Sequence, residues 1–138
     1  MNHYYPSYDF LVFSLIQGIK EDYIYIGITE NNEPIATLWY QKKGAFHCFP
    51  YLHVIAVKES AQRHGYGKRF MEFFENEIMK EGNRKLLRTK AFLLVNTENQ
   101  KAINMYDECG YKCIAELQGL YRKNITERLM MKVICRQV

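Results

Sequence analysis

The chain has 138 residues and a formal net charge of +4, which fits a single, mildly basic domain. Hydrophobic residues make up 48% and charged residues 25% of the sequence, the proportions of an ordinary globular protein that buries its own core. No apolar run reaches the roughly 20 residues that a membrane-spanning helix needs, and the first residues lack the basic start of a secretory signal. We therefore expect one cytoplasmic domain over residues 1–138, with no membrane association.

The four cysteines, Cys48, Cys109, Cys113 and Cys135, contain no Cys-x-x-Cys pair. A zinc site needs a tighter cluster, and a disulfide framework suits a smaller secreted domain, so we expect reduced cysteines and no metal. Lysines and arginines are dispersed rather than gathered in a stripe, which argues against nucleic-acid binding. A mild positive charge instead suits a polyanionic ligand, such as a cofactor with several phosphates.

The first half of the chain predicts one helix followed by three strands. Apolar spacing favours a helix over residues 8–20. Residues 23–29 and 35–40 are rich in strand-forming residues and flank a turn signal at 30–34, so they predict a hairpin. A further strand is expected within residues 46–57.

The second half predicts alternating helices and strands. A helix is expected from Lys68 to about Gly82, which is a suitable residue just past a helix end. The remaining elements are expected at 86–95 (strand), 99–108 (helix), and 111–117 and 128–134 (strands joined by a polar loop, 118–127). Because hairpins occur at both ends, the pattern predicts a mixed α/β (α+β) fold with a mostly antiparallel sheet.

The turn between the third strand and the second helix has the sequence QRHGYG, residues 62–67. The first turn of a helix has N–H groups without intrahelical partners, and Gly65 and Gly67 allow the backbone to approach a ligand closely. Cationic or proton-donating side chains surround this turn at Arg63, His64 and Lys68. The arrangement predicts a cradle for a phosphate or diphosphate, although a tight turn into a core-packing helix is the simpler alternative. It is neither a nucleotide P-loop nor a dinucleotide fingerprint, because the required spacing is missing.

A second motif lies downstream, where residues 96–111 read N-x-x-N-x-x-A-x-x-x-Y-x-x-x-G-Y. Together with Q-x-x-G-x-G at 62–67, and in this order, it closely resembles the Gcn5-related N-acetyltransferase (GNAT) family over about residues 50–135. The resemblance implies a twisted sheet flanked by helices, with two central parallel strands, 51–57 and 86–95, that splay apart. It also implies acetyl-CoA as the co-substrate.

The resemblance further implies where acetyl-CoA lies. Splayed strands leave backbone groups unpaired, and the peptide-like pantetheine arm can satisfy them as an added strand would. Main-chain contacts are expected from Ile55, Ala56 and Val57, with the Val57 N–H near the thioester. The diphosphate is expected at the turn and the helix start: Gln62, Arg63, His64, Gly65, Tyr66, Gly67 and Lys68. Asn96 and Asn99 are expected to bond the pantetheine arm, with simple helix capping as the alternative.

Tyr106 is the expected general acid, since the family carries its acid at this place in the helix. Transfer from a thioester to an amine expels a thiolate, and a nearby phenol, protonated at neutral pH, can protonate it. An aromatic residue at this helical spacing is otherwise a core residue.

His53 is the expected base that accepts the proton of the acceptor's ammonium group. Simple alternation would place Tyr51, His53 and Ile55 on one face of their strand, beside the acyl site. The run 52–57 is similar to the strand of the arylalkylamine N-acetyltransferase branch, which has a histidine here, and histidine titrates near pH 6.5. A chain of waters is the alternative, and Glu33 and Glu59 are weaker candidates.

The sequence departs from the family pattern at its start, where the segment before Tyr8 is too short for a convincing first strand. Either that strand is missing, or residues 1–5 replace it, or a second copy of the chain completes the edge as a homodimer. The acceptor is expected to be a primary amine of a small molecule or a peptide, bordered by residues 118–127. Candidates for an aromatic wall around it are Trp39, Phe46, Tyr51 and Tyr121.

The expected activity is direct N-acetyl transfer from acetyl-CoA. A non-catalytic acyl-CoA sensor and an acyltransferase for longer chains are the alternatives. A covalent intermediate on Cys109 is not expected, because no positioned histidine and acid accompany it.

Overall fold

The computed structural model describes residues 22–28, 33–81, 84–85 and 87–135. The helix expected at 8–20, and the replacement strand expected at 1–5, lie outside the described residues. In the part of the chain that is described, no helix is long and apolar enough to cross a membrane.

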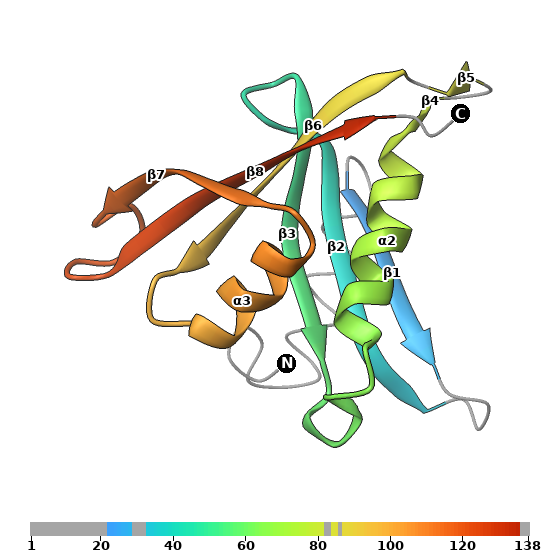
Figure 1. Ribbon diagram of the computed structural model, residues 1–138, viewed down its shortest axis with the longest axis horizontal. Helices are drawn as coiled ribbons and strands as arrows, with labels where there is room; N and C mark the ends of the chain where they lie inside the picture. The colour runs from blue at the N-terminus through green and yellow to red at the C-terminus, as the bar shows by residue number, and fades with distance from the viewer. Residues whose placement is uncertain (1–21, 29–32, 82–83, 86, 136–138) are drawn as a thin grey trace.

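A twisted six-stranded sheet forms the centre of the molecule, in the order β1-β2-β3-β6-β8-β7 (Figure 1). All neighbouring strands of this sheet run antiparallel except β3 and β6, which run parallel, so the predicted mixed sheet is confirmed. The strands are β1 (Asp22–Ile28), β2 (Pro34–Ala45), β3 (Phe49–Val57), β6 (Arg88–Asn96), β7 (Lys112–Gln118) and β8 (Thr126–Cys135).

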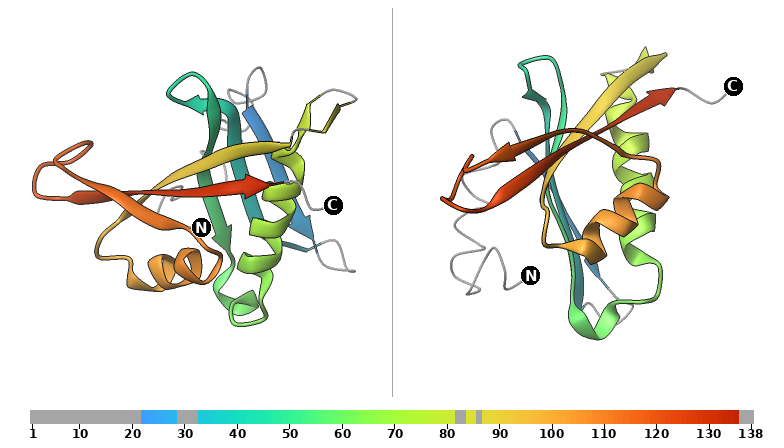
Figure 2. Two further views of the ribbon diagram at one scale, coloured as in Figure 1. Left: turned by 45° about the horizontal axis from the view of Figure 1, so that its top comes forward. Right: turned by 60° about the vertical axis from the view of Figure 1, so that its left-hand side comes forward.

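The two described α-helices, α2 (Tyr66–Ile78) and α3 (Gln100–Glu108), lie on the same face of the sheet (Figure 2, right). Their apolar residues recur every three or four positions and pack in one core cluster: Met71, Phe74 and Ile78 of α2 with Ile103 and Tyr106 of α3. The sheet residues of that cluster define what we call the helix face: Leu38, Tyr40, Leu52, Ala91, Leu93, Val95, Met130 and Ile134. We call the opposite side of the sheet the far face.

The parallel strands β3 and β6 pair over a short stretch only. Their register joins Tyr51 to Phe92 and Leu52 to Leu93, and no described residue pair continues it. Beyond these pairs β3 runs on to Val57 and β6 to Asn96, so the two strands separate toward the same end. The predicted splay of the central strands is therefore present.

A β-bulge in β3 changes which side chains share a face. Trp39 of β2 lies opposite Val54, but Tyr40 lies opposite Leu52, so the register skips His53. One extra residue in a strand reverses the alternation beyond it. Leu52 and Ile55 accordingly both pack against the helix-face core. The expectation that His53 and Ile55 share a face is wrong.

Two boundaries also differ from the sequence prediction. β2 extends to Ala45, and the hairpin turn into β3 uses Phe46 and His47, both with positive φ (56° and 58°). Helix α2 ends at Ile78 rather than near Gly82, because the chain turns directly into a small hairpin of β4 (Lys80–Glu81) and β5 (Arg84–Lys85).

Candidate active site

The backbone of β3 faces the gap between the splayed strands at alternate residues. The Lys58 N–H donates to the Ile35 carbonyl of the neighbouring strand β2 at 2.7 Å. Because backbone direction alternates along a strand, Ile55 and Val57 turn their N–H and C=O groups toward the β6 side. The same alternation turns the main chain of Ala56 toward β2, away from the contact expected for it.

The carbonyl of Val57 is held by the side chain of Gln62, whose Nε2 donates to it at 3.0 Å. Gln62 thereby ties the turn that precedes α2 to the end of β3. The Val57 N–H and the main chain of Ile55 still face the gap, where a peptide-like ligand could add as a strand.

The turn before α2 exposes a run of backbone donors. Arg63 and Gly65 both have left-handed φ (68° and 78°), and Gly65 caps the helix without a side-chain hydrogen bond. The first intrahelical donor is the Arg69 N–H, which bonds the Gly65 carbonyl at 3.1 Å. Among the described residues no backbone bond uses the N–H groups of residues 63–68. Such consecutive donors at a helix start bind anions well.

The side chains around this turn differ in how they are used. Lys68 forms an ion pair with Glu108 at the end of α3, which raises the Lys68 pKa, so its charge is shared with a carboxylate. His64 is exposed, with its ring centroid 5.9 Å from that of Tyr66. Gly67 lies against α3, where an added Cβ would sit 3.7 Å from the Met105 Cε. The Lys68 ammonium, expected at the phosphate site, is therefore already paired with a carboxylate of α3.

Lys101 is a cation that the sequence reasoning did not single out. Its Nζ donates to the Gln62 Oε1 at 2.5 Å, which joins the start of α3 to the turn before α2. With Glu59 and Arg63, these two residues line a hollow of about 330 Å³. In the sequence, Lys101 stands two residues after Asn99. Only the fold brings Lys101 close to the turn that precedes α2.

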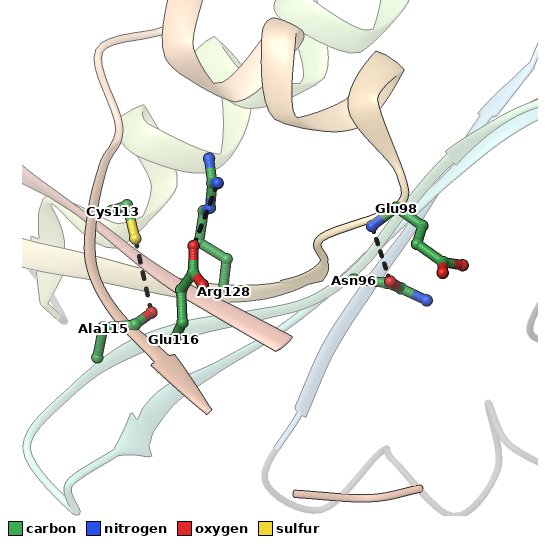
Figure 3. A network of polar contacts seen from close by, with 6 residues as sticks. All are labelled: Asn96, Glu98, Cys113, Ala115, Glu116 and Arg128. Carbon is green, nitrogen blue, oxygen red and sulfur yellow. Dashed lines mark hydrogen bonds and ion pairs between the residues drawn. The ribbon is translucent and has the colours of Figure 1, made fainter. Parts of the chain in front are cut away.

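Asn96 and Asn99 both act in local capping. The Asn96 Oδ1 accepts from the Glu98 N–H at 2.9 Å (Figure 3), and the Asn99 Oδ1 caps α3 by accepting from the Ala102 N–H at 3.2 Å. The amide nitrogens of these side chains, which are donors, take no part in the capping bonds.

Replacing Asn99 with alanine should destabilise the protein by about 1 kcal/mol, because α3 loses its N-cap. Asn99→Ser keeps a capping oxygen but removes the amide donor. Chemical denaturation and CoA titration of both variants separate the two roles: a serine variant with normal stability and normal CoA affinity would show that Asn99 acts as a cap only.

Tyr106 lies in α3 and is buried (8% exposed) in the helix-face core. Its ring packs edge-on against Tyr111, with 6.2 Å between centroids. The Tyr111 hydroxyl donates to the Glu75 Oε2 at 3.1 Å, and Lys132 donates to the Glu75 Oε1 at 2.7 Å. Burial, with Glu75 nearby, raises the pKa of Tyr111 well above its ordinary value. The Tyr111 hydroxyl therefore belongs to a structural network with Glu75 and Lys132.

His53 lies on the far face rather than beside Ile55. Its ring centroid is 4.4 Å from that of Trp39 and 5.8 Å from that of Tyr51. Trp39 alternates with the core residues Leu38 and Tyr40, which places it on the far face. Tyr106 packs on the helix face, so the two expected catalytic residues lie on opposite sides of the sheet.

The remaining candidates for acid–base or metal chemistry are less suited. Glu33 is exposed and bonded to Lys58 at 2.6 Å, and this hydrogen bond lowers the Glu33 pKa, which makes it a poor base. Burial raises the pKa of Cys109, which disfavours a nucleophilic thiolate. No group of metal-ligating side chains occurs among the residues described.

Comparison with known proteins gives a consistent assignment. The family model described as acetyltransferase (GNAT) family matches residues 2–111. No curated protein matches the sequence.

Several solved structures share the fold. A GNAT-family protein from Desulfovibrio desulfuricans matches with a TM-score of 0.74 at 17% identity, covering 91% of this chain and 77% of that one. The spermidine N-acetyltransferase of Vibrio cholerae, in complex with CoA and spermine, gives 0.71 at 18% identity, covering 94% and 77%. The ribosomal-protein-S18-alanine N-acetyltransferase of Escherichia coli gives 0.69 at 21% identity, covering 94% and 79%.

Proposed function

Because this chain belongs to the GNAT acetyltransferase family, we propose that it transfers an acetyl group from acetyl-CoA directly to a primary amine. The observation that carries the proposal is the splay of β3 and β6 beside the start of α2, where no side chain caps the helix. The splayed strands offer unpaired main-chain groups to a pantetheine arm, and the start of α2 offers N–H groups to a diphosphate. No metal takes part in the proposed reaction.

The proposed cofactor contacts follow from this geometry. The Ile55 main chain and the Val57 N–H bind the pantetheine arm, and the donors of residues 63–68 bind the diphosphate. Lys101, held by Gln62, adds a positive charge beside the same turn. Ala56 contributes less because its main chain faces β2. Lys68 contributes less because it pairs with Glu108.

The proposed chemistry needs no covalent enzyme intermediate. The neutral amine nitrogen attacks the thioester carbonyl, a C–N bond forms, and the C–S bond breaks. His53, directly or through water, accepts the proton of the incoming ammonium before the attack, and the Tyr106 hydroxyl protonates the departing thiolate. The second proton, which the nitrogen loses as the amide forms, restores the Tyr106 hydroxyl. The positions of these two residues on opposite faces fit an acceptor that approaches from the far face and a cofactor on the helix side.

The acceptor is a small molecule or a peptide. Structures of the same fold include enzymes named for spermidine and for the alanine of a ribosomal protein, which represent both kinds. The proposed setting is the cytoplasm, and a homodimer remains one way to complete the edge of the sheet.

His53→Gln should lower the rate of transfer about tenfold or more, because glutamine keeps the polar contact but cannot take up a proton. The variant should bind acetyl-CoA normally. Measuring kcat/KM from pH 6 to 9 tests this role. If the variant keeps both the wild-type rate and the wild-type pH profile, water rather than His53 accepts the proton.

The proposal is tested by calorimetry with acetyl-CoA, followed by detection of free CoA thiol with a panel of amines. Binding with thiol release would establish the transferase. Binding without release, from any amine or peptide, would favour the alternative of an acyl-CoA sensor. Faster release from longer acyl-CoA thioesters would favour the other alternative, a longer-chain acyltransferase. Failure to bind acetyl-CoA would overturn the proposal.

A further inference from the structure

Strand β1 forms one edge of the sheet, and β7 forms the opposite edge (Figure 1). In β2 the main chain of Ile35 faces β3, where its carbonyl accepts a hydrogen bond. Backbone direction alternates along a strand, so Leu38 of β2 faces β1, and Tyr25, which lies opposite Leu38, faces β2. The N–H and C=O groups of Ile24 and Ile26 therefore point outward from the sheet, and no strand in the described part of the chain pairs with them.

The two edges differ in how they are protected against pairing with another chain. Charged side chains and bulges are the usual protection of an edge strand. Strand β7 carries Lys112 and Glu116, both exposed, and its register shifts between Cys113 and Ala115. Residues 23–27 of β1 include no charged residue, and their register with β2 is continuous. Strand β1 is therefore the edge that is open to pairing.

Apolar side chains line the β1 edge on both faces of the sheet. On the helix face, Tyr23 is 37% exposed, and the Tyr25 ring packs edge-on against Phe73 of α2 with 4.8 Å between centroids. Phe70 of α2 is only partly buried beside them. Ile26 alternates with Tyr25, so it lies on the far face, where it is 49% exposed. A partner strand would cover apolar surface on both sides of this edge.

Strand β1 is complementary to itself in an antiparallel register. The register that overlaps the whole strand, Asp22–Ile28, places Tyr25 opposite Tyr25 of a second copy, on a two-fold axis. Ile24 then lies opposite Ile26 of the second copy. Because both of these residues point their main-chain groups outward, they can exchange N–H···O=C hydrogen bonds on each side of the axis.

The same register also suits the side chains. Opposite residues of an antiparallel pair share a face, so the helix faces of the two copies lie on the same side. Tyr23 lies opposite Gly27 of the second copy, and an aromatic residue beside an edge glycine helps to pin the register. The Phe70 ring covers Gly27 so closely that no side chain would fit there. The Tyr23 ring would therefore meet an aromatic partner across the seam.

We propose that β1 pairs with β1 of a second copy and joins the two six-stranded sheets into one continuous sheet. The main-chain hydrogen bonds fix the register, and the aromatic and isoleucine side chains supply apolar contact. Because both copies use the same surface, the contact is saturated in a dimer. Ile24 lies opposite Trp39, whose ring lies against that of His53, so the seam borders the proposed acceptor side of each copy. The dimer does not depend on the proposed transferase function.

Light scattering coupled to size-exclusion chromatography tests the dimer. The wild-type protein should have twice the chain mass of 16.5 kDa. Ile26→Lys should weaken the dimer at least tenfold, because it brings an ammonium group to an apolar seam from each copy. Ile26→Pro should weaken it as well, since proline removes an outward N–H without a loss from the β1–β2 ladder.

Ile114→Lys is the matched control. Ile114 lies in the opposite edge strand β7 and is also 49% exposed, so the two lysine variants alter equally accessible isoleucines at the two edges. The control should remain dimeric. Circular dichroism and thermal unfolding establish that each variant is folded before its mass is compared.

The register is tested separately by disulfide cross-linking. Opposite residues that exchange no hydrogen bonds have Cα atoms about 4.5 Å apart, which a disulfide can span. Tyr25→Cys should therefore give a covalent dimer on oxidation with diamide, in a background where serine replaces the three exposed cysteines, Cys48, Cys113 and Cys135. Tyr23→Cys in the same background should remain unlinked, because the two copies of residue 23 would lie about 13 Å apart along the seam.

Each other outcome contradicts the proposal. A wild-type protein that is monomeric at every concentration would overturn it, and would fit an edge that residues 1–21 of the same chain cover. A dimer that persists in both Ile26 variants, or that is lost equally in Ile114→Lys, would place the contact elsewhere. Cross-linking through Tyr23→Cys but not Tyr25→Cys would refute the register. Because none of these measurements uses thiol release, failure of the transferase function would leave them unchanged.

Discussion

Replacing Tyr106 with phenylalanine should lower kcat about a hundredfold or more, because the variant retains the ring but loses the phenolic proton that the thiolate needs. Acetyl-CoA affinity should stay near that of the wild type, since no proposed cofactor contact uses this hydroxyl. Steady-state kinetics and calorimetry with acetyl-CoA measure the two quantities separately. A fall in kcat without a fall in affinity is the signature of an interaction that is made only in the transition state.

Tyr111 provides an internal control for this experiment. It is also a buried tyrosine, 6.2 Å from Tyr106 between ring centroids, and its hydroxyl donates to Glu75. Tyr111→Phe should destabilise the fold by about 1 kcal/mol through loss of that hydrogen bond, yet leave kcat nearly unchanged. If Tyr106→Phe leaves both the rate and its pH profile unchanged, the acid role is wrong and Tyr106 is a core residue alone.

The parts of the fold that depend on local sequence could be predicted. The hairpin of β1 and β2 followed from two runs of strand-forming residues, and α3 followed from Asn99 at its start and Gly110 just past its end. Gly110 has φ of +97°, which explains why a glycine ends this helix. The splay of β3 and β6 was predicted from the family resemblance, not from the residues of the strands themselves.

The parts that depend on pairing between distant residues could not be predicted. Nothing in the run from Tyr51 to Val57 marks His53 as the bulged residue, because the bulge is a property of the β2–β3 register. The turn at Phe46 and His47 lacks the glycine or asparagine that usually signals positive φ in a hairpin. The bulge matters for the candidate site, because it leaves His53 and Ile55 on opposite faces of the sheet.

The candidate site likewise combines features that local sequence predicts with contacts that only the fold creates. The sequence predicted the glycine turn and its donors, since consecutive N–H groups at a helix start follow from local conformation. It could not predict that Lys68 pairs with Glu108 or that Lys101 reaches Gln62, because these contacts join α3 to the turn before α2.

Replacing Gly65 with valine should weaken CoA binding at least tenfold and also destabilise the protein. Gly65 has φ of +78°, a conformation that costs a non-glycine residue about 1–2 kcal/mol, and β-branching adds to that strain. An added Cβ would meet no atom within 4 Å, so packing does not require glycine here. The requirement comes from the backbone conformation, which holds the N–H groups of residues 63–68 in position.

Two further variants separate strain from the loss of a binding surface. Gly65→Asn tolerates left-handed φ, so its stability should stay close to that of the wild type, while its side chain would occupy the open space beside the N–H groups. Gly67→Ala places a methyl group in ordinary contact with Met105 and should stabilise α2 by about 0.5–1 kcal/mol. If CoA affinity, measured by calorimetry on the folded variants, survives in both Gly65→Val and Gly65→Asn, the diphosphate does not bind at this turn. A loss in both Gly65 variants, with normal affinity in Gly67→Ala, would locate the diphosphate at the exposed donors that precede α2.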